Sequence, residues 1–249
     1  MSYLVLAIRF LTVVPVPGRE AEGAGALGRA AWWFPPVGLA LGACLIAVDR
    51  MLRLAFPPLL AAILLIAAWK ILTGGLHLDG LADSIDGLAG RDPERRIAIM
   101  RDSRLGAFGA VALALSLLIS VGAVDALPAP RRPVVLLLAP AIGRLAPVLI
   151  GPLFPPATPG EGYGADFLGG LSMWATPVYV AGLWILAALM LGPWGGILLP
   201  CALGAALLWA VWLVSRVGGL TGDALGGSVE IGEMAALLSA VALIHIHLI

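Results

Sequence analysis

Long runs without a charged side chain constrain this chain more than any other feature of its sequence. Residues 30–48, 105–124, 167–215 and 234–249 contain no Asp, Glu, Lys or Arg. A helix that crosses the hydrocarbon core of a bilayer needs about 20 mostly apolar residues, and runs of this kind supply them. A membrane barrel would instead show short alternating segments. The sequence therefore predicts an all-α, polytopic transmembrane helix bundle.

The predicted bundle has about seven spans after a short N-terminal segment. We expect the spans at residues 32–53, 57–73, 106–125, 134–150, 174–191, 196–216 and 234–249. Residues 3–16 are apolar, but Arg9, Pro15 and Pro17 interrupt them, which favours an interfacial or re-entrant segment over a crossing. The whole chain, residues 1–249, is expected to form a single integral membrane domain.

Polar side chains concentrate in three connections, residues 74–105, 151–173 and 217–233, which fall on one side of a seven-span bundle. The first connection is rich in arginine, and the positive-inside rule then places this side in the cytoplasm. Four arginines near the opposite side argue against that orientation: Arg50, Arg53, Arg131 and Arg132. The formal net charge is +0, so the bulk charge favours neither a nucleic acid nor an acidic partner.

Two of these connections resemble each other. Residues 74–84 read GGLHLDGLADS and residues 218–228 read GGLTGDALGGS, and both segments follow an apolar span. Duplicated helix–loop units that meet at one site are common in membrane proteins, although a chain with 32 glycines can also match itself by chance. The sequence leaves open whether the domain consists of two diverged helix–loop halves.

The strongest chemical signal is the acidic run of residues 79–87, DGLADSIDG. In a helix the carboxylates of Asp79, Asp83 and Asp86 share one face and repel one another unless a cation lies among them. Mg²⁺ suits such ligands, because it commonly binds a few carboxylates together with substrate phosphates. The alternative is an acidic juxtamembrane turn, but acidic residues beside spans are costly and usually functional. We predict that these three aspartates bind a metal ion.

The second echoing segment contributes Asp223. It is expected to complete the same metal site or to hold a second ion, although a helix cap explains its position equally well. Glu233 is expected in the first turn of the last span, where a carboxylate suits the helix dipole. His77 precedes the acidic run and is a candidate base, although it lies on a different helical face from Asp79.

Residues 91–106 carry the cationic candidates. Asp92 as the N-cap and Pro93 as the first helical residue predict a short helix here. Arginine forks bind phosphates through two hydrogen bonds, so three residues are candidates for holding a diphosphate beside the metal: Arg101, Ser103 and Arg104. The alternative is an interfacial helix whose arginines contact anionic lipid.

Taken in order, these motifs resemble the cobalamin synthase family, also called adenosylcobinamide-GDP ribazoletransferase. The matching segments are residues 9–12 with 15–17, 74–87, 100–106 and 218–226, which span nearly the whole chain. The chain departs from the family at Val13 and Val14, where members often carry an arginine. The resemblance implies a bacterial inner-membrane enzyme that uses Mg²⁺ as its cofactor.

The resemblance also implies the reaction and the residues that perform it. The family joins adenosylcobinamide-GDP to α-ribazole or its 5′-phosphate, releases GMP, and forms adenosylcobalamin or its 5′-phosphate. We expect Asp79, Asp83 and Asp223 to bind the metal, and Asp86 to act as a ligand or general base. His77 and Arg104 are further catalytic candidates. The expected substrate contacts are Gly75, Arg101, Ser103, Arg104 and Thr221.

Two rival functions are less compatible with the motifs. A CDP-alcohol phosphotransferase also sets aspartates beside a span, but its longer acidic motif, with Ala-Arg after the first pair, is absent from this sequence. An ion-coupled transporter predicts carboxylates near the middle of a span, whereas Asp79, Asp83 and Asp86 cluster at a span's end. The lipid bilayer is the expected environment, and the sequence leaves the oligomeric state open.

Overall fold

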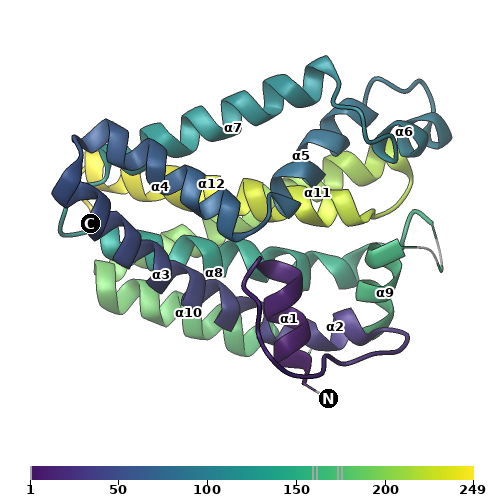
Figure 1. Cartoon of the computed structure of the whole chain (residues 1–249), viewed down its shortest axis with the longest axis horizontal. Coiled ribbons are helices and arrows are strands. Elements are labelled where there is room, and N and C mark those ends of the chain that lie inside the picture. Colours follow the sequence, from purple (N-terminus) through teal and green to yellow (C-terminus); the bar gives the residue numbers. More distant parts are fainter. Residues whose placement is uncertain (1, 159, 161, 173, 175) are drawn as a thin grey trace.

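The computed structural model describes residues 2–158, 160, 162–172, 174 and 176–249 and shows a bundle of helices that run along one long axis (Figure 1). The helices are α1 (Tyr3–Leu11), α2 (Ala26–Ala30), α3 (Phe34–Ala55), α4 (Pro58–Leu72), α5 (Leu76–Gly87), α6 (Pro93–Met100), α7 (Ala107–Ala126), α8 (Arg132–Ile150), α9 (Gly162–Gly170), α10 (Thr176–Leu191), α11 (Leu198–Val217) and α12 (Gly222–His245). The predicted all-α class is confirmed.

Among the described residues, five helical segments are long and apolar enough to cross a membrane: Ala26–Ala55, Ala107–Ala126, Arg132–Leu153, Pro193–Val217 and Gly222–His245. The number rises to six if the bent pair of α4 and α5 counts as one span. Large side chains on α7, such as Phe108 and Leu118, are exposed, as expected of a helix that faces lipid. The polytopic bundle is therefore confirmed, whereas the expected count of about seven spans is not.

Helix α8 is the centre of the bundle. It is the most deeply buried of the candidate spans, and α3, α10, α11 and α12 all pack against it. The contact with α3 is close, because a Cβ atom at Gly38 or Gly42 would lie 2.6 Å from the backbone of α8. Glycines four residues apart form a flat strip that lets two membrane helices approach each other closely.

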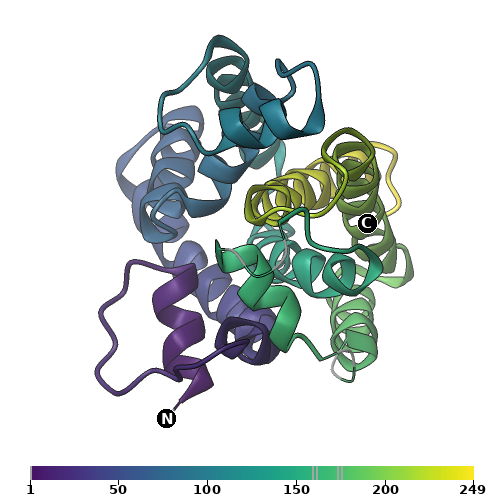
Figure 2. The same cartoon turned by 90° about the vertical axis from the view of Figure 1, so that its right-hand side faces the viewer.

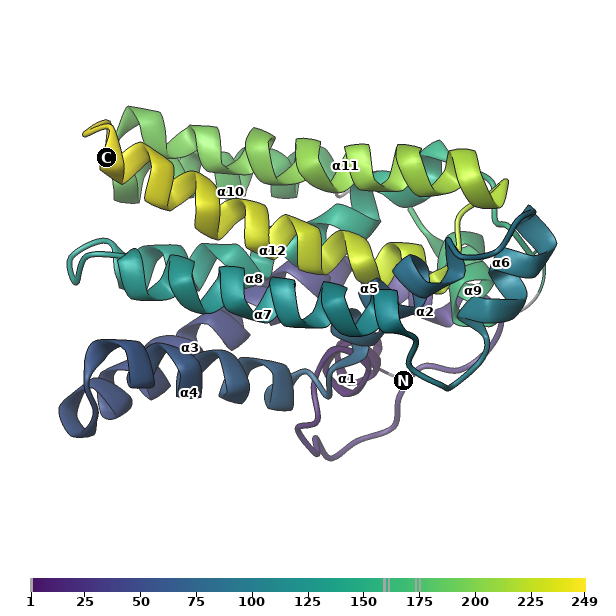
Figure 3. The same cartoon turned by 90° about the horizontal axis from the view of Figure 1, so that it is seen from above.

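The polar connections gather at one end of the bundle. In Figure 3 α5, α6 and α9 lie toward one end and the C-terminus lies at the other, and Figure 2 views the bundle from the α6 and α9 end. Helix α5 leads from the end of α4 toward this end, after a turn in which Gly74 and Gly75 adopt φ values of +62° and +70°. Glycine tolerates this left-handed backbone, and the turn bends α5 by 89° from the direction of α4.

The last helix begins earlier than the sequence predicted. Helix α12 starts at Gly222, and the Thr221 hydroxyl caps it by accepting a hydrogen bond from the backbone N–H of Ala224 at 3.0 Å. The expected loop over residues 217–233 is therefore wrong for most of its length. Glu233 lies in the middle of α12 rather than in the first turn of a span. Buried basic partners from other helices explain why this carboxylate is accommodated there.

Candidate active site

A cavity of about 280 Å³ lies where α5, α8 and α12 meet. Its polar lining includes Asp79, Asp223, Arg101 and Arg144, which come from four different parts of the chain. The segment before α9 closes one side, because Leu220 donates a backbone hydrogen bond to Pro155 and accepts one from Ala157, at 2.8 and 2.9 Å. The cavity therefore combines the three polar connections that the sequence analysis singled out.

The two echoing segments adopt similar local structures. Gly74 and Gly218 both have positive φ, of +62° and +87°, and each ends an apolar helix. Asp79 and Asp223, which occupy equivalent positions in the echo, both lie in the first turn of the helix that follows. Helices α5 and α12 then pack against each other. The common origin of the two segments stays a prediction, but they meet at one site.

Close packing of α5 on α12 brings the acidic residues together. A Cβ atom at Gly80 would lie 3.0 Å from the carbonyl oxygen of Asp223. The acidic run is helical in α5, and Asp83 lies within electrostatic range of Asp79, Asp86 and Asp223. Carboxylates from two segments far apart in the sequence thus converge at one end of the cavity.

These carboxylates do not form a closed metal cage. Within the described ranges, no group of three or more His, Cys, Asp or Glu side chains is placed to hold a metal ion unaided. The donors nevertheless have the chemistry that Mg²⁺ prefers, because this ion usually takes one or two carboxylates and fills its other positions with water and substrate phosphates. Asp79 and Asp223 line the cavity and can serve as such ligands.

Asp86 is engaged in a structural contact. Its two carboxylate oxygens accept hydrogen bonds from the backbone N–H groups of Gly106 and Gly109, at 2.7 and 2.8 Å. A negative charge at this position stabilises the N-terminus of α7. A Cβ atom at either glycine would collide with the carboxylate. The contact ties α5 to α7, and the expected role of Asp86 as ligand or base stays a prediction.

Three further predicted residues lie at or beside the cavity. His77 is buried in its wall, and Thr221 lines it at the start of α12. Gly75 precedes α5 and has no atom within 4 Å of a Cβ built on it, so its backbone is open to a ligand. The catalytic role predicted for His77 and the substrate contacts predicted for Gly75 and Thr221 stay predictions that are compatible with these positions.

The predicted phosphate-binding residues divide into two groups. Arg101 lines the cavity near Asp223. Ser103 and Arg104 are exposed, and the Arg104 guanidinium pairs with Asp102 at 2.6 Å. The hydrogen bonds and charge of Arg104 lower the pKa of Asp102 to about 2. Arg104 therefore holds a carboxylate through Nε and Nη2 at the protein surface.

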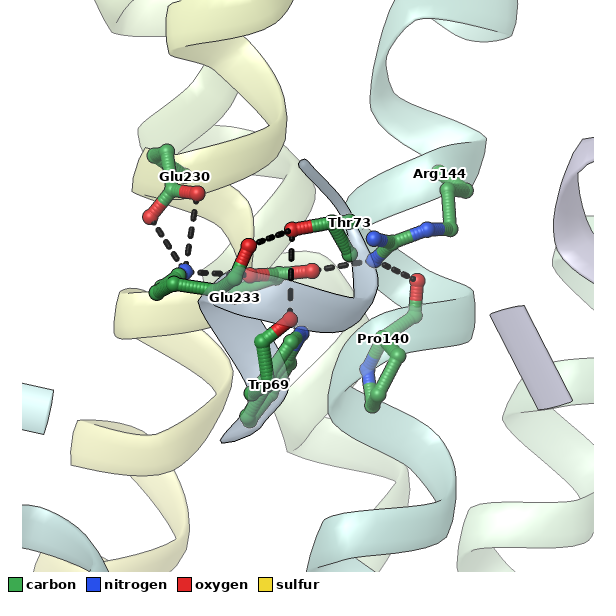
Figure 4. Close-up of polar contacts among 7 residues, drawn as sticks. Trp69, Thr73, Pro140, Arg144, Glu230 and Glu233 are labelled. Atoms are coloured by element: carbon green, nitrogen blue, oxygen red, sulfur yellow. Dashed lines mark hydrogen bonds and ion pairs between the residues drawn. The ribbon is translucent and has the colours of Figure 1, made fainter. Parts of the chain in front are cut away.

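A buried ion-pair network beside the cavity was not predicted (Figure 4). Lys70 donates to Glu230 at 2.6 and 2.8 Å and to Glu233 at 3.2 Å. Arg144 donates to the other oxygen of Glu233 and to the Pro140 carbonyl. The sequence could have indicated this network, because Lys70 and Arg144 are charged residues inside expected spans. Charged side chains there normally have partners and functions.

Aromatic side chains form an apolar part of the cavity that the sequence analysis also missed. The rings of Phe10 and Phe34 stack with centroids 5.9 Å apart, and those of Phe34 and Phe167 with centroids 5.8 Å apart. All three residues line the cavity. They come from α1, α3 and α9, so only the folded chain brings them together.

Comparison with known proteins places the chain in one family. The family model for cobalamin-5-phosphate synthase matches residues 3–241. The adenosylcobinamide-GDP ribazoletransferase of Syntrophobacter fumaroxidans is 40% identical over 249 residues, which cover 98% of this chain and 99% of that protein. The protein of the same name from Brevibacillus brevis is 37% identical over 246 residues, with 96% and 97% coverage. No solved structure matches. The chain belongs to the cobalamin-5-phosphate synthase family.

Proposed function

We propose that this protein transfers the adenosylcobinamide phosphate group of adenosylcobinamide-GDP to α-ribazole or α-ribazole 5′-phosphate. GMP is released, and adenosylcobalamin or its 5′-phosphate is formed. Family membership over nearly the whole chain supports this reaction. The structural observation that carries it is the convergence of Asp79, Asp223 and Arg101 on one cavity, because transfer between phosphate esters needs cationic stabilisation of a diphosphate.

The reaction requires a displacement at one phosphorus atom. A ribose hydroxyl oxygen of the acceptor forms a bond to the phosphorus that carries the cobinamide, and the bond from this phosphorus to the bridging oxygen breaks. GMP leaves with the electron pair, so negative charge grows on its phosphate. His77, which lines the cavity, is the proposed acceptor of the hydroxyl proton.

The carboxylates and arginines have separate proposed roles. Asp79, Asp83 and Asp223 would hold Mg²⁺, which supplies positive charge beside the diphosphate when it is bound. Arg101 adds a second positive group in the same cavity. Arg104, which pairs with Asp102 at the surface, is the proposed further contact of the diphosphate. Asp86 is best suited to positioning α5 against α7, because both of its oxygens accept backbone hydrogen bonds.

We propose that the protein lies in the bacterial inner membrane with its acidic end in the cytoplasm. Arginines cluster at that end, in and around α6, and the positive-inside rule favours this orientation. Arg50, Arg53 and Arg131 lie near the opposite turns and oppose it. Arg132 is not counted among the arginines of that side, because it is 2% exposed and pairs with Asp49 inside the bundle.

The experiment is to incubate the purified protein with adenosylcobinamide-GDP, α-ribazole 5′-phosphate and Mg²⁺, and to measure GMP and the new corrinoid by mass spectrometry. The wild-type protein is expected to form both in equal amounts. Asp83→Asn should abolish turnover while leaving the protein inserted, whereas Asp125→Asn, in α7 outside the cavity, should not. A wild-type protein that releases no GMP would refute the proposal.

A further inference from the structure

Arg144 is a fully buried arginine that uses only part of its guanidinium within the protein. Its exposed fraction is 0%, and Nη1 donates to Glu233 and to the Pro140 carbonyl. Its Nε and Nη2 atoms have no hydrogen-bond partner in the part of the chain that the structure describes. These two atoms form one edge of the planar group and present two parallel N–H donors. A buried, charged donor pair without an acceptor is costly, so an acceptor from outside the protein is expected.

A second buried arginine in the same helix shows what a purely structural pairing looks like here. Arg132 is 2% exposed and begins α8. Its Nε donates to the Leu127 carbonyl at 3.3 Å, its Nη1 to Asp49 at 3.2 Å, and its Nη2 to the Asp125 and Leu127 carbonyls at 3.2 Å. Every nitrogen of this guanidinium has a partner. A buried arginine in α8 can thus be fully hydrogen-bonded, and the two unpaired donors of Arg144 are specific to its position.

That position is the wall of the cavity. Arg144 lines it together with His77 and Val229. Its Nε and Nη2 atoms are themselves buried, so a phosphate in the cavity reaches this edge only after a small shift of the side chains that cover it. The contacts of Nη1 with Glu233, which Lys70 also holds, fix the guanidinium in one orientation. A guanidinium edge matches two oxygens of a phosphate group better than it matches a single acceptor such as a ring nitrogen. The two parallel donors therefore fit two oxygens of a terminal phosphate group.

The lining of the cavity indicates which substrate supplies this phosphate group. The smaller substrate combines a planar aromatic base with a ribose and a 5′-phosphate. Phe10, Phe34 and Phe167 supply an apolar, aromatic surface in the same cavity, which suits such a base.

We propose that the Nε–Nη2 edge of Arg144 binds the 5′-phosphate of the acceptor nucleotide inside the cavity. This inference rests on the proposed transfer to an α-ribazole substrate and identifies the binding site for one part of it. The protein then distinguishes α-ribazole 5′-phosphate from α-ribazole through a residue in the middle of the membrane bundle. Arg144 is a substrate-binding residue in this account, and Lys70, Glu230 and Glu233 position it.

The test compares the two acceptors in the full-length protein. Arg144→Lys keeps a positive charge beside Glu233 but removes the two-donor edge, and Arg132→Lys is the matched control in the same helix. With saturating adenosylcobinamide-GDP, Arg144→Lys should raise KM for α-ribazole 5′-phosphate at least about tenfold and leave KM for α-ribazole nearly unchanged. Arg132→Lys should change neither. An equal loss with both acceptors, or no loss, overturns the proposal.

A binding measurement on the wild-type protein covers the case in which Arg144→Lys does not fold. It uses calorimetry with each acceptor, without donor and with chelator present, so that neither turnover nor a metal ion contributes. The 5′-phosphate form should bind at least about tenfold more tightly than α-ribazole. Equal affinities contradict the Arg144 site. Failure of the wild-type protein to turn over either acceptor refutes the proposed function instead, so the two failures are distinguishable.

Discussion

Gly80 of α5 lies directly against the backbone of Asp223 in α12, so that a Cβ atom at position 80 would be 3.0 Å from the Asp223 carbonyl oxygen. This contact sets how closely Asp79 can approach Asp223, because Asp79 and Gly80 are neighbours in the same helix. The spacing of the acidic groups thus depends on a glycine that carries no charge itself.

Gly80→Ala should separate α5 from α12 by a few tenths of an ångström and lower the rate of GMP release by about tenfold, since small misplacements of reacting groups are costly. Folding should weaken by only about 1–3 kcal/mol, the usual effect of overpacking. The control is Gly232→Ala in α12, where the nearest atom to a Cβ is 3.5 Å away. A Gly80→Ala protein with the wild-type rate would show that this spacing is unimportant.

Sequence reasoning succeeded where the signal was local. The sequence allowed Asp79, Asp83 and Asp86 to share one face if their segment is helical, and α5 is helical over all three residues. It also placed the N-cap of α6 at Asp92, whose side chain accepts a hydrogen bond from the N–H of Arg95. Both features depend on residues within two helical turns, which a pattern can capture.

Features that depend on distant partners were not predicted. Glu233 was expected in the first turn of the last span, but it lies in the middle of α12 because Lys70, more than 100 residues away, neutralises it together with Glu230. Arg144, 89 residues from Glu233, lay inside the expected span of residues 134–150, and its partner was not predicted. The backbone N–H groups that hold Asp86 were not predicted because they carry no sequence signal, and its expected role as ligand or general base stays a prediction.

The capping contact of Asp86 should make Gly109 intolerant of a side chain. Gly109→Ala forces the carboxylate away from the N-terminus of α7 and removes two charge-assisted hydrogen bonds, each of which contributes roughly 1.5–3 kcal/mol. Gly122→Ala in the same helix is the control, because no atom lies within 4 Å of its Cβ position. Thermal unfolding in detergent measures both. Equal melting temperatures for the two variants would argue against the cap.

Lys70 should be essential for folding because it is the ion-pair partner of Glu230. Lys70→Met leaves a 3% exposed carboxylate without its cation, which typically costs roughly 3–5 kcal/mol. Adding Glu230→Gln to Lys70→Met should recover much of this loss, because a neutral amide is cheaper to bury. The melting temperatures of the wild type, the single variant and the double variant test this. A single variant as stable as the wild type contradicts it.

The Asp102–Arg104 pair should not contribute to the pH dependence of turnover. Because Arg104 lowers the pKa of Asp102 to about 2, the pair is complete above the ordinary pKa of aspartate and is lost only as the pH falls through about 2. The pH–rate profiles of the wild type and of Asp102→Asn should therefore have the same shape between about pH 5 and about pH 9. A displaced profile in that window would mean that Asp102 is protonated there.

The central claim is that Asp79, Asp83 and Asp223 hold a divalent cation together with the diphosphate of the substrate. Its most direct test is GMP release after exhaustive chelation, followed by titration with Mg²⁺. The account predicts that release stops in chelator and returns with Mg²⁺, and that Asp223→Asn shifts the titration to higher Mg²⁺. Full GMP release by the chelated wild-type protein would contradict it.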